Sequence, residues 1–223
     1  MYEDELKKEI AGIKAEMRKL KDDMERPGKD LTPEPDQLSI ERLDVLRRLL
    51  ADRKASLAES PVPYEPDEAE IRAAALLDNL PYLRKLSFSL GGFFGLPKQF
   101  TVEENGDRLK VTDALDFTFP FLPVLRLGFT PAKLPPLLTN MDALRAYLRE
   151  LHVEEWMREY TPDRFGHMVL DGTQWELRLE FSNGAPDWEA WGSNSYPYNF
   201  EDFQALFGMS FYDDGKSDPF DLL

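Results

Sequence analysis

The clearest alternation of hydrophobic and polar positions in the chain lies between residues 175 and 193. Apolar residues occupy every second position of its first half: Trp175, Leu177, Leu179 and Phe181. This period of two predicts a strand with one buried and one solvated face, and Asn183-Gly184 predicts the turn that follows it. In the next strand Trp188 and Ala190 continue one face, so we expect Trp191 on the opposite face.

A polar loop and a short helix complete this region. Asn199 is expected to cap a helix whose apolar side carries Phe200, Phe203, Leu206 and Phe207. Aromatic rings beside amide and hydroxyl groups suit a sugar or a protein hot spot. The candidate partner or ligand contacts are therefore Trp191, Ser193, Asn194, Ser195 and Tyr198. The alternative is that most of this loop packs onto the sheet, with Asn194 turning the backbone.

A period of three and four governs residues 1–60. It predicts a helix with an unbroken heptad seam: Leu6, Ile10, Ile13, Met17, Leu20 and Met24. After a loop that contains prolines, a second apolar series predicts another helix: Ile40, Leu43, Leu46, Leu49, Leu50 and Leu57. Ser39 is a candidate cap for this helix, unless Thr32 and Pro33 start it earlier.

Two packings of these helices are open. The short loop favours an antiparallel helical hairpin, whereas the charges beside the seam also allow the Leu6–Met24 helix to pair in parallel with a second copy. In the hairpin, two lysines of the first helix, Lys14 and Lys21, would face Arg47 and Lys54 of the second. This juxtaposition of like charges is unfavourable.

The rest of the chain predicts alternating short elements. We expect helices from Asp67 and over residues 140–159, a strand over 86–94, and a β-hairpin formed by residues 99–104 and 108–112. Residues 114–138 are apolar and rich in proline, and we expect them to be irregular with one short strand.

This order predicts an α+β fold: an antiparallel sheet of about five strands with flanking helices, preceded by an N-terminal α-helical hairpin or coiled-coil arm. The expected boundaries are 1–60 for the arm, 61–66 for a proline-rich linker, 67–210 for the α+β domain and 211–223 for an acidic tail.

The charge of the chain narrows the classes of partner. Its 42 acidic and 27 basic residues give a net charge of −15, which disfavours nucleic acid and an anionic membrane and leaves a basic protein partner. The chain has no cysteine, which excludes disulfides and thiolate chemistry and fits a cytoplasmic protein. The charged first residues do not resemble a signal peptide, and prolines interrupt the most apolar run, so no membrane segment is expected.

Catalytic and metal-binding motifs do not emerge from the sequence, and we expect no catalytic, cofactor or metal site. The two histidines, His152 and His167, show no metal-ligand or triad spacing and are expected at the surface or at helix ends. Two sets of carboxylates, Glu154, Glu155 and Glu159, and Glu176 and Glu180, form the least favoured candidate for acid–base chemistry. Neither the glycine-rich residues 91–95 nor the acidic residues 213–218 complete a phosphate or calcium loop.

The tryptophan strand and the Gly192-Ser-Asn-Ser-Tyr-Pro-Tyr-Asn-Phe200 loop resemble a family of uncharacterised proteins from gut and soil Firmicutes. The likeness covers the last third of the chain and, more loosely, the strands between residues 86 and 112. It implies a bacterial, intracellular domain and no activity.

Three function hypotheses follow. The first is a non-enzymatic protein-interaction module, for example an acidic inhibitor or immunity-type protein that neutralises a basic partner, with self-association through the Leu6–Met24 helix as a further possibility. The second is a small-ligand or glycan binding module that uses the Trp191 loop. The third is an enzyme built on carboxylates.

Overall fold

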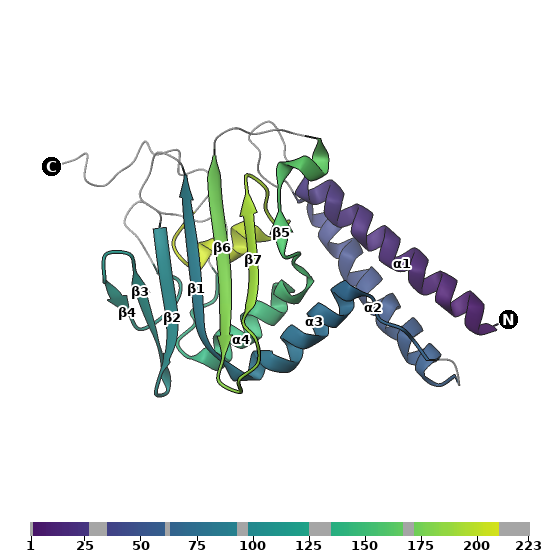
Figure 1. Ribbon diagram of the computed structural model, residues 1–223, viewed down its shortest axis with the longest axis horizontal. Coiled ribbons are helices and arrows are strands. Elements are labelled where there is room, and N and C mark those ends of the chain that lie inside the picture. The colour runs from purple at the N-terminus through teal and green to yellow at the C-terminus, as the bar shows by residue number, and fades with distance from the viewer. Residues whose placement is uncertain are drawn as a thin grey trace.

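The computed structural model describes residues 2–26, 35–60, 63–92, 98–124, 135–166 and 172–209. Its elements are α1 (Tyr2–Glu25), α2 (Gln37–Ala58), α3 (Glu68–Asn79), η1 (Leu80–Tyr82), β1 (Leu83–Gly92), β2 (Lys98–Asn105), β3 (Arg108–Asp113), β4 (Thr118–Phe119), α4 (Met141–Glu150), η2 (Val153–Glu155), β5 (Glu159–Tyr160), η3 (Pro162–Phe165), β6 (Thr173–Phe181), β7 (Trp188–Ser193) and α5 (Phe200–Ala205). Two helices therefore precede an α+β domain (Figure 1).

Helices α1 and α2 form the antiparallel helical hairpin, the first of the two predicted packings (Figure 1). The heptad seam of α1 is turned inward, and its buried members are Leu6, Ile10, Met17 and Met24. They pack with Leu43, Leu46 and Leu57 of α2. A dimer through this seam would have to expose these residues first. Asp36 caps α2 by accepting a 2.9 Å hydrogen bond from the Ser39 N–H, so the predicted cap at Ser39 is wrong.

The sheet contains seven strands among the described residues, in the order β4-β3-β2-β1-β6-β7-β5. The five long strands are the predicted ones, and their neighbours pair antiparallel. The count of about five left out β4, which falls where one short strand was expected within residues 114–138, and β5, which was not expected; each has two residues and is too short to show a period. Because β5 pairs parallel with β7, the sheet is mixed.

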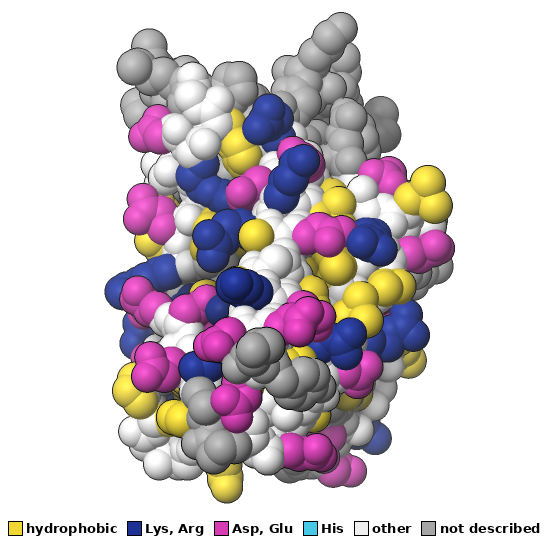
Figure 2. All heavy atoms as spheres, turned by 90° about the vertical axis from the view of Figure 1, so that its right-hand side faces the viewer, with side chains coloured by type: hydrophobic (Ala, Val, Ile, Leu, Met, Phe, Trp, Pro, Cys, Tyr) yellow, Lys and Arg dark blue, Asp and Glu magenta, His cyan; other side chains and the backbone are white. Residues whose placement is uncertain are grey.

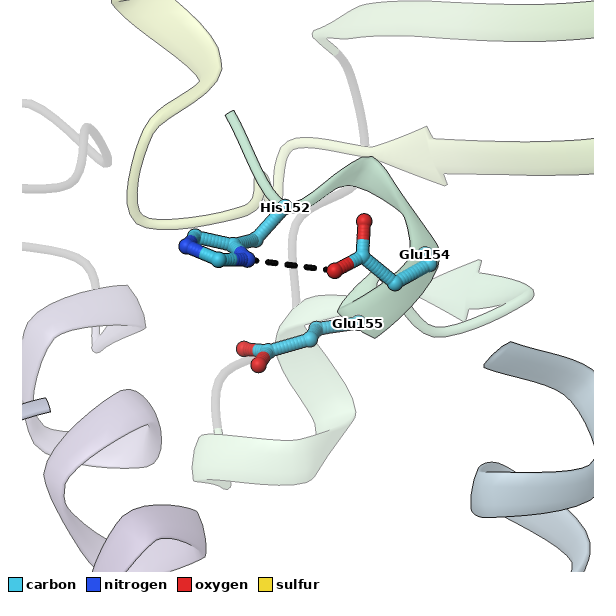
Figure 3. A group of neighbouring side chains, drawn as sticks. All are labelled: His152, Glu154 and Glu155. Atoms are coloured by element: carbon cyan, nitrogen blue, oxygen red, sulfur yellow. Dashed lines mark hydrogen bonds and ion pairs between the residues drawn. The ribbon is translucent and has the colours of Figure 1, made fainter. Parts of the chain in front are cut away.

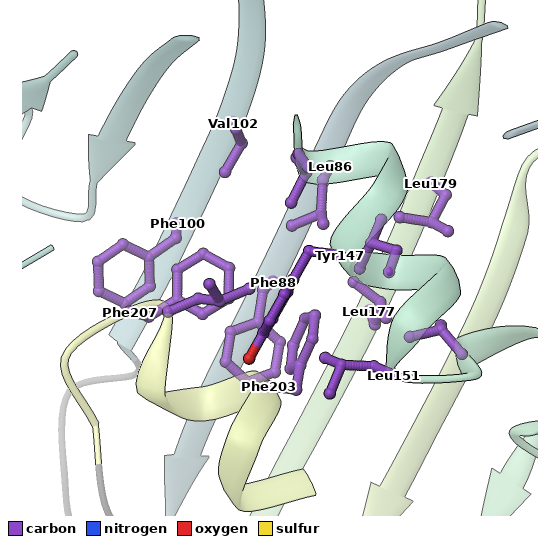
Figure 4. Packing of buried hydrophobic residues seen from close by; sticks show 14 of the residues in the cluster. Leu86, Phe88, Phe100, Val102, Tyr147, Leu151, Leu177, Leu179, Phe203 and Phe207 are labelled. Carbon is purple, nitrogen blue, oxygen red and sulfur yellow. The ribbon is translucent and has the colours of Figure 1, made fainter. Parts of the chain in front are cut away.

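Helices α4 and α5 cover one face of the sheet and form the main core with it (Figure 4). The predicted apolar side of α5 is confirmed, because Phe200, Phe203, Leu206 and Phe207 are fully buried. Phe88 of β1 meets Phe203 and Phe207 with ring centroids 5.0 Å apart. Such aromatic contacts add about 0.5–1.5 kcal/mol each to the free energy gained from burial.

Helix α4 is shorter than the predicted 140–159. It is capped by Asn140, whose side chain accepts from the Ala143 N–H at 2.9 Å. The helix ends at Glu150, and His152 then adopts a left-handed conformation with φ 53°. The chain turns there, so Trp156 is buried after the helix and not on its face, and Glu159 lies in β5. The turn places Glu159 beside β7.

The other face of the sheet is left uncovered by the described elements (Figure 1). Its side chains belong to the polar positions of the strands, so the face is hydrophilic apart from Trp191. No helix in the described ranges has the length and apolar character needed to cross a bilayer. Several predicted features lie outside the described residues: His167, Phe93 to Gly95, residues 125–134 of the proline-rich stretch and the tail 211–223.

Candidate functional site

Trp191 lies on the uncovered face of the sheet. In β7 the residues Trp188, Ala190 and Gly192 are buried, whereas the Trp191 side chain is 40% exposed. The prediction that Trp191 lies on the face opposite to Trp188 and Ala190 is therefore confirmed. The other three tryptophans, all within the described residues, are at most 7% exposed. An exposed indole on a strand surface is a typical contact group in protein interfaces.

Two carboxylates flank Trp191 in the same row of the sheet. Glu176 of β6 is its antiparallel partner, and Glu159 of β5 is its parallel partner. Partners on adjacent strands point to the same face, with Cβ atoms about 5 Å apart in an antiparallel pair. Glu159 and Glu176 are exposed and form no ion pair with any described residue. The indole ring therefore lies between two carboxylates that are open to a ligand.

The neighbouring row balances its own charge. Arg178 donates to Asp187 at 2.9 Å and 2.5 Å, and its Nε lies 3.8 Å from a Glu189 oxygen. The cation next to the row of Glu159, Trp191 and Glu176, the guanidinium of Arg178, is thus already shared by two acids. Consequently Glu159 and Glu176 keep their negative charge available at the surface.

Of the other predicted contact residues, one is partly exposed and three are buried. Ser193 follows Trp191 on the same face and is partly exposed, whereas Asn194, Ser195 and Tyr198 are at most 7% exposed. Asn194 has φ 51° and accepts a 2.8 Å hydrogen bond from the Thr173 N–H. It turns the backbone as the alternative reading supposed, and these three side chains are withdrawn from solvent.

The buried members of the loop hold the fold together. The Ser195 carbonyl accepts a 2.9 Å hydrogen bond from Nε1 of Trp175. Asn199 stands at the start of α5, but its side chain makes no cap, contrary to prediction. Instead it accepts from the Trp156 indole at 2.9 Å and donates to the Leu151 carbonyl. The amide thus ties α5 to the chain that follows α4.

The carboxylates suggested for acid–base chemistry do not form a catalytic pair. Glu180 is paired with Arg84 and Lys85, and Glu155 with Lys21 and Arg47. Burial alone would raise the pKa of Glu155, but the hydrogen bond from Arg47 and the charge of Lys21 lower it to about 2. A group with that pKa is a poor general acid or base near neutral pH.

A small cluster of possible metal ligands lies after α4. Ligand atoms of His152, Glu154 and Glu155 fall within 4.8 Å of one another. Figure 3 shows His152 directed at Glu154, to which its Nδ1 lies 3.1 Å away, while the Glu155 side chain lies close to both and extends toward the helical hairpin. The two cations that already hold Glu155 would repel a metal ion, so the donor set does not suit one.

A hollow of about 450 Å³ lies along α1, and Trp191 and its neighbouring carboxylates take no part in its lining. Its lining is Lys7, Ile10, Ala11, Lys14, Ala15, Arg18, Tyr64 and Glu65. Lys14 is already bound to Glu70 at 2.8 Å, and Glu65 adds an acid to the rim. The charged residues of the lining are thus three bases, one of them already paired, and one acid.

No protein family, curated protein or solved structure matches this chain. The resemblance to a Firmicutes family stays a prediction. The sequence analysis placed Glu159 and Glu176 in separate sets of carboxylates, because it assigned residues 140–159 to a single helix and so did not place Glu159 in a strand. Only the strand pairing brings both carboxylates to Trp191.

Proposed function

We propose that this chain is a non-enzymatic interaction module that binds a basic protein through the uncovered face of its sheet. A lysine or arginine side chain of the partner lies on the Trp191 ring, between Glu159 and Glu176. The observation that carries the proposal is this row of an exposed indole with a carboxylate on either side. We call it the Trp191 row.

The chemistry of the Trp191 row selects a cation. A cation over an exposed tryptophan gains about 0.5–1 kcal/mol, and more when the contact is dry. Each carboxylate within reach accepts a charge-assisted hydrogen bond, and an arginine can donate on both sides because its N–H groups spread in a plane. The net charge of −15 further speeds the encounter with a basic partner.

An acidic inhibitor or immunity-type protein is one concrete version of this function. The absence of cysteine supports a cytoplasmic site of action, and localisation of a tagged chain tests it. Glycan binding is the second candidate, supported by Trp191 and the hydroxyl of Ser193 beside it. It ranks lower because the amide and hydroxyl groups of Asn194, Ser195 and Tyr198 are buried.

The test is a calorimetric titration of the full chain with a peptide of about eight alternating arginine and glycine residues. Trp191→Ala should weaken binding about tenfold, which corresponds to loss of about 1.4 kcal/mol. The double variant Glu159→Gln with Glu176→Gln should weaken it at least as much.

Two matched controls separate the site from general attraction. Tyr82→Ala removes another exposed aromatic ring, and Glu104→Gln with Glu150→Gln removes the same charge from exposed positions elsewhere. Both should leave the affinity within about twofold at an ionic strength of about 0.15 M, where distant charges are screened. Equal losses for the control and row variants would refute the proposal. Binding of a neutral oligosaccharide that depends on Trp191 would favour the second candidate instead.

A further inference from the structure

The helical hairpin is joined to the α+β domain mainly by charged side chains. Helices α1 and α2 pack closely on each other, whereas long side chains bridge the space to the domain. The ion pairs across this junction join Lys14 to Asp67 and Glu70, Lys21 and Arg47 to Glu155, Lys54 to Glu70, and Arg164 to Asp22 and Glu25. Figure 2 shows this side of the molecule, with basic and acidic side chains interspersed over it.

Each of two domain carboxylates is held by one cation from each helix. Glu155 lies 2.6 Å from Nζ of Lys21 on α1, and both of its oxygens accept 2.9 Å hydrogen bonds from Arg47 on α2. Glu70 is held in the same way by Lys14, at 2.8 Å, and by Lys54. The like charges that face each other across the hairpin are therefore neutralised by acids of the domain.

On each helix the two cations that bind Glu70 and Glu155 are separated by the same number of residues. Lys14 and Lys21 are seven residues apart on α1, and Arg47 and Lys54 are seven apart on α2. Seven residues are two helical turns, about 10.5 Å. Beside the Glu155 contact, Tyr198 of the domain belongs to one buried apolar cluster with Met17, Met24, Leu43 and Leu46 of the hairpin. Arg47 also donates a 2.9 Å hydrogen bond to the Tyr198 hydroxyl.

These contacts form a binding surface for a basic helix. It offers two acids two turns apart and an aromatic ring for the apolar side of the helix. The contacts depend on side chains that remain 14–33% exposed for the four cations, so salt screens them more than it would screen a dry core. A junction of this kind opens more readily than an apolar one.

We propose that Glu70, Glu155 and Tyr198 form a second interaction surface, that the hairpin occupies it as a detachable arm, and that a partner helix with two basic residues at positions i and i+7 takes the place of the arm. The occupant seen in the structure supplies the pattern: each of its helices meets both acids with this spacing. This surface does not involve the Trp191 row, so either proposal can fail without the other.

Because the chain has no cysteine, two spin labels can be placed without background. Arg48→Cys on α2 and Glu104→Cys on β2 are exposed positions whose separation reports the place of the arm. At low salt a single distance is expected, that of the docked arm. The fraction of molecules with a longer distance should increase as the ionic strength rises to about 1 M, where the screening length falls to about 3 Å.

The probe is an alanine-based helical peptide with two lysines seven residues apart. Its matched control has the same composition with the lysines five residues apart, which puts them on different sides of the helix. The first peptide should increase the fraction of molecules with the longer distance. It should also bind about tenfold tighter than the control, because only it reaches both acids. The double variant Glu70→Gln with Glu155→Gln should show the longer distance at low salt and lose the preference for spacing, while Trp191→Ala changes neither.

A single unchanged distance under all conditions would overturn the proposal and make the hairpin a fixed part of the core. Opening by salt without discrimination between the two peptides would also overturn it, because the arm would then cover no binding surface.

Discussion

Glu25, the last residue of α1, should lower the stability of the protein at neutral and alkaline pH. Its side chain is 5% exposed, with Arg164 3.1 Å away and Lys21 and Asp22 on the same helix. Burial raises its pKa from 4.5 to about 7, although the charges of Arg164 and Lys21 oppose the shift. The carbonyl end of the helix adds a further negative potential.

The pH window follows from the two pKa values. Below pH 4.5 Glu25 is protonated in both the folded and the unfolded chain, so it carries no penalty. As the pH rises above 4.5, the unfolded chain loses the proton freely while the folded chain keeps it, and above about 7 the folded chain must hold a buried charge. Each pH unit between the two values corresponds to about 1.4 kcal/mol, so the penalty approaches about 3 kcal/mol at pH 8.

Glu25→Gln removes this charge while keeping the size of the side chain. We expect the free energy of unfolding in urea to rise by up to about 3 kcal/mol at pH 8 and to change little near pH 4.5. Glu16→Gln is the matched control, because Glu16 is also on α1 and paired with an arginine, Arg42, but half exposed. It should stay within about 0.5 kcal/mol at both pH values. A Glu25→Gln protein less stable than the wild type at pH 8 would refute the reasoning and show that the ion pair with Arg164 outweighs the burial.

Three further substitutions test local structure, two in the packing behind the Trp191 row and one on α1, each measured by urea unfolding. Asn199→Ala should destabilise by about 2–4 kcal/mol, because it leaves the buried Trp156 indole N–H and a carbonyl unpaired; a loss below about 1 kcal/mol would contradict this. Gly192→Ala should cost more than about 2 kcal/mol and change the fluorescence of Trp175, since the added Cβ would lie 2.4 Å from its Nε1. Gly12→Ala meets nothing within 4 Å on a helix and should stabilise by about 0.5–1 kcal/mol, so a loss there would mean that α1 is not helical at this point.

Periodicity in the sequence was sufficient for the main elements. The heptad seam located the hairpin, and the alternation around Trp191 placed it on the uncovered face. Both succeed because one side of each element is buried, so the period of the pattern is the period of the backbone. The end of α4 could not be found in this way, because apolar residues continue beyond it and a single left-handed residue, His152, redirects the chain.

The candidate site was less accessible to sequence reasoning. Glu159, Glu176 and Trp191 come from three strands, and their proximity depends on register, which local patterns do not contain. Local sequence patterns also could not show how the repulsion expected between the basic residues of the two hairpin helices is relieved. The carboxylates that neutralise these residues, Glu70 and Glu155, come from parts of the chain distant in sequence.

The most direct test of the central claim is the NMR signal of the Trp191 indole N–H during a titration of the full chain. The signal can be assigned with Trp191→Phe. An arginine and glycine peptide should shift it and leave the three buried indoles in place, and the same peptide with citrulline, a neutral group of the same shape, should not. If citrulline and arginine shift the signal equally, or if neither does, the Trp191 row does not recognise a cation.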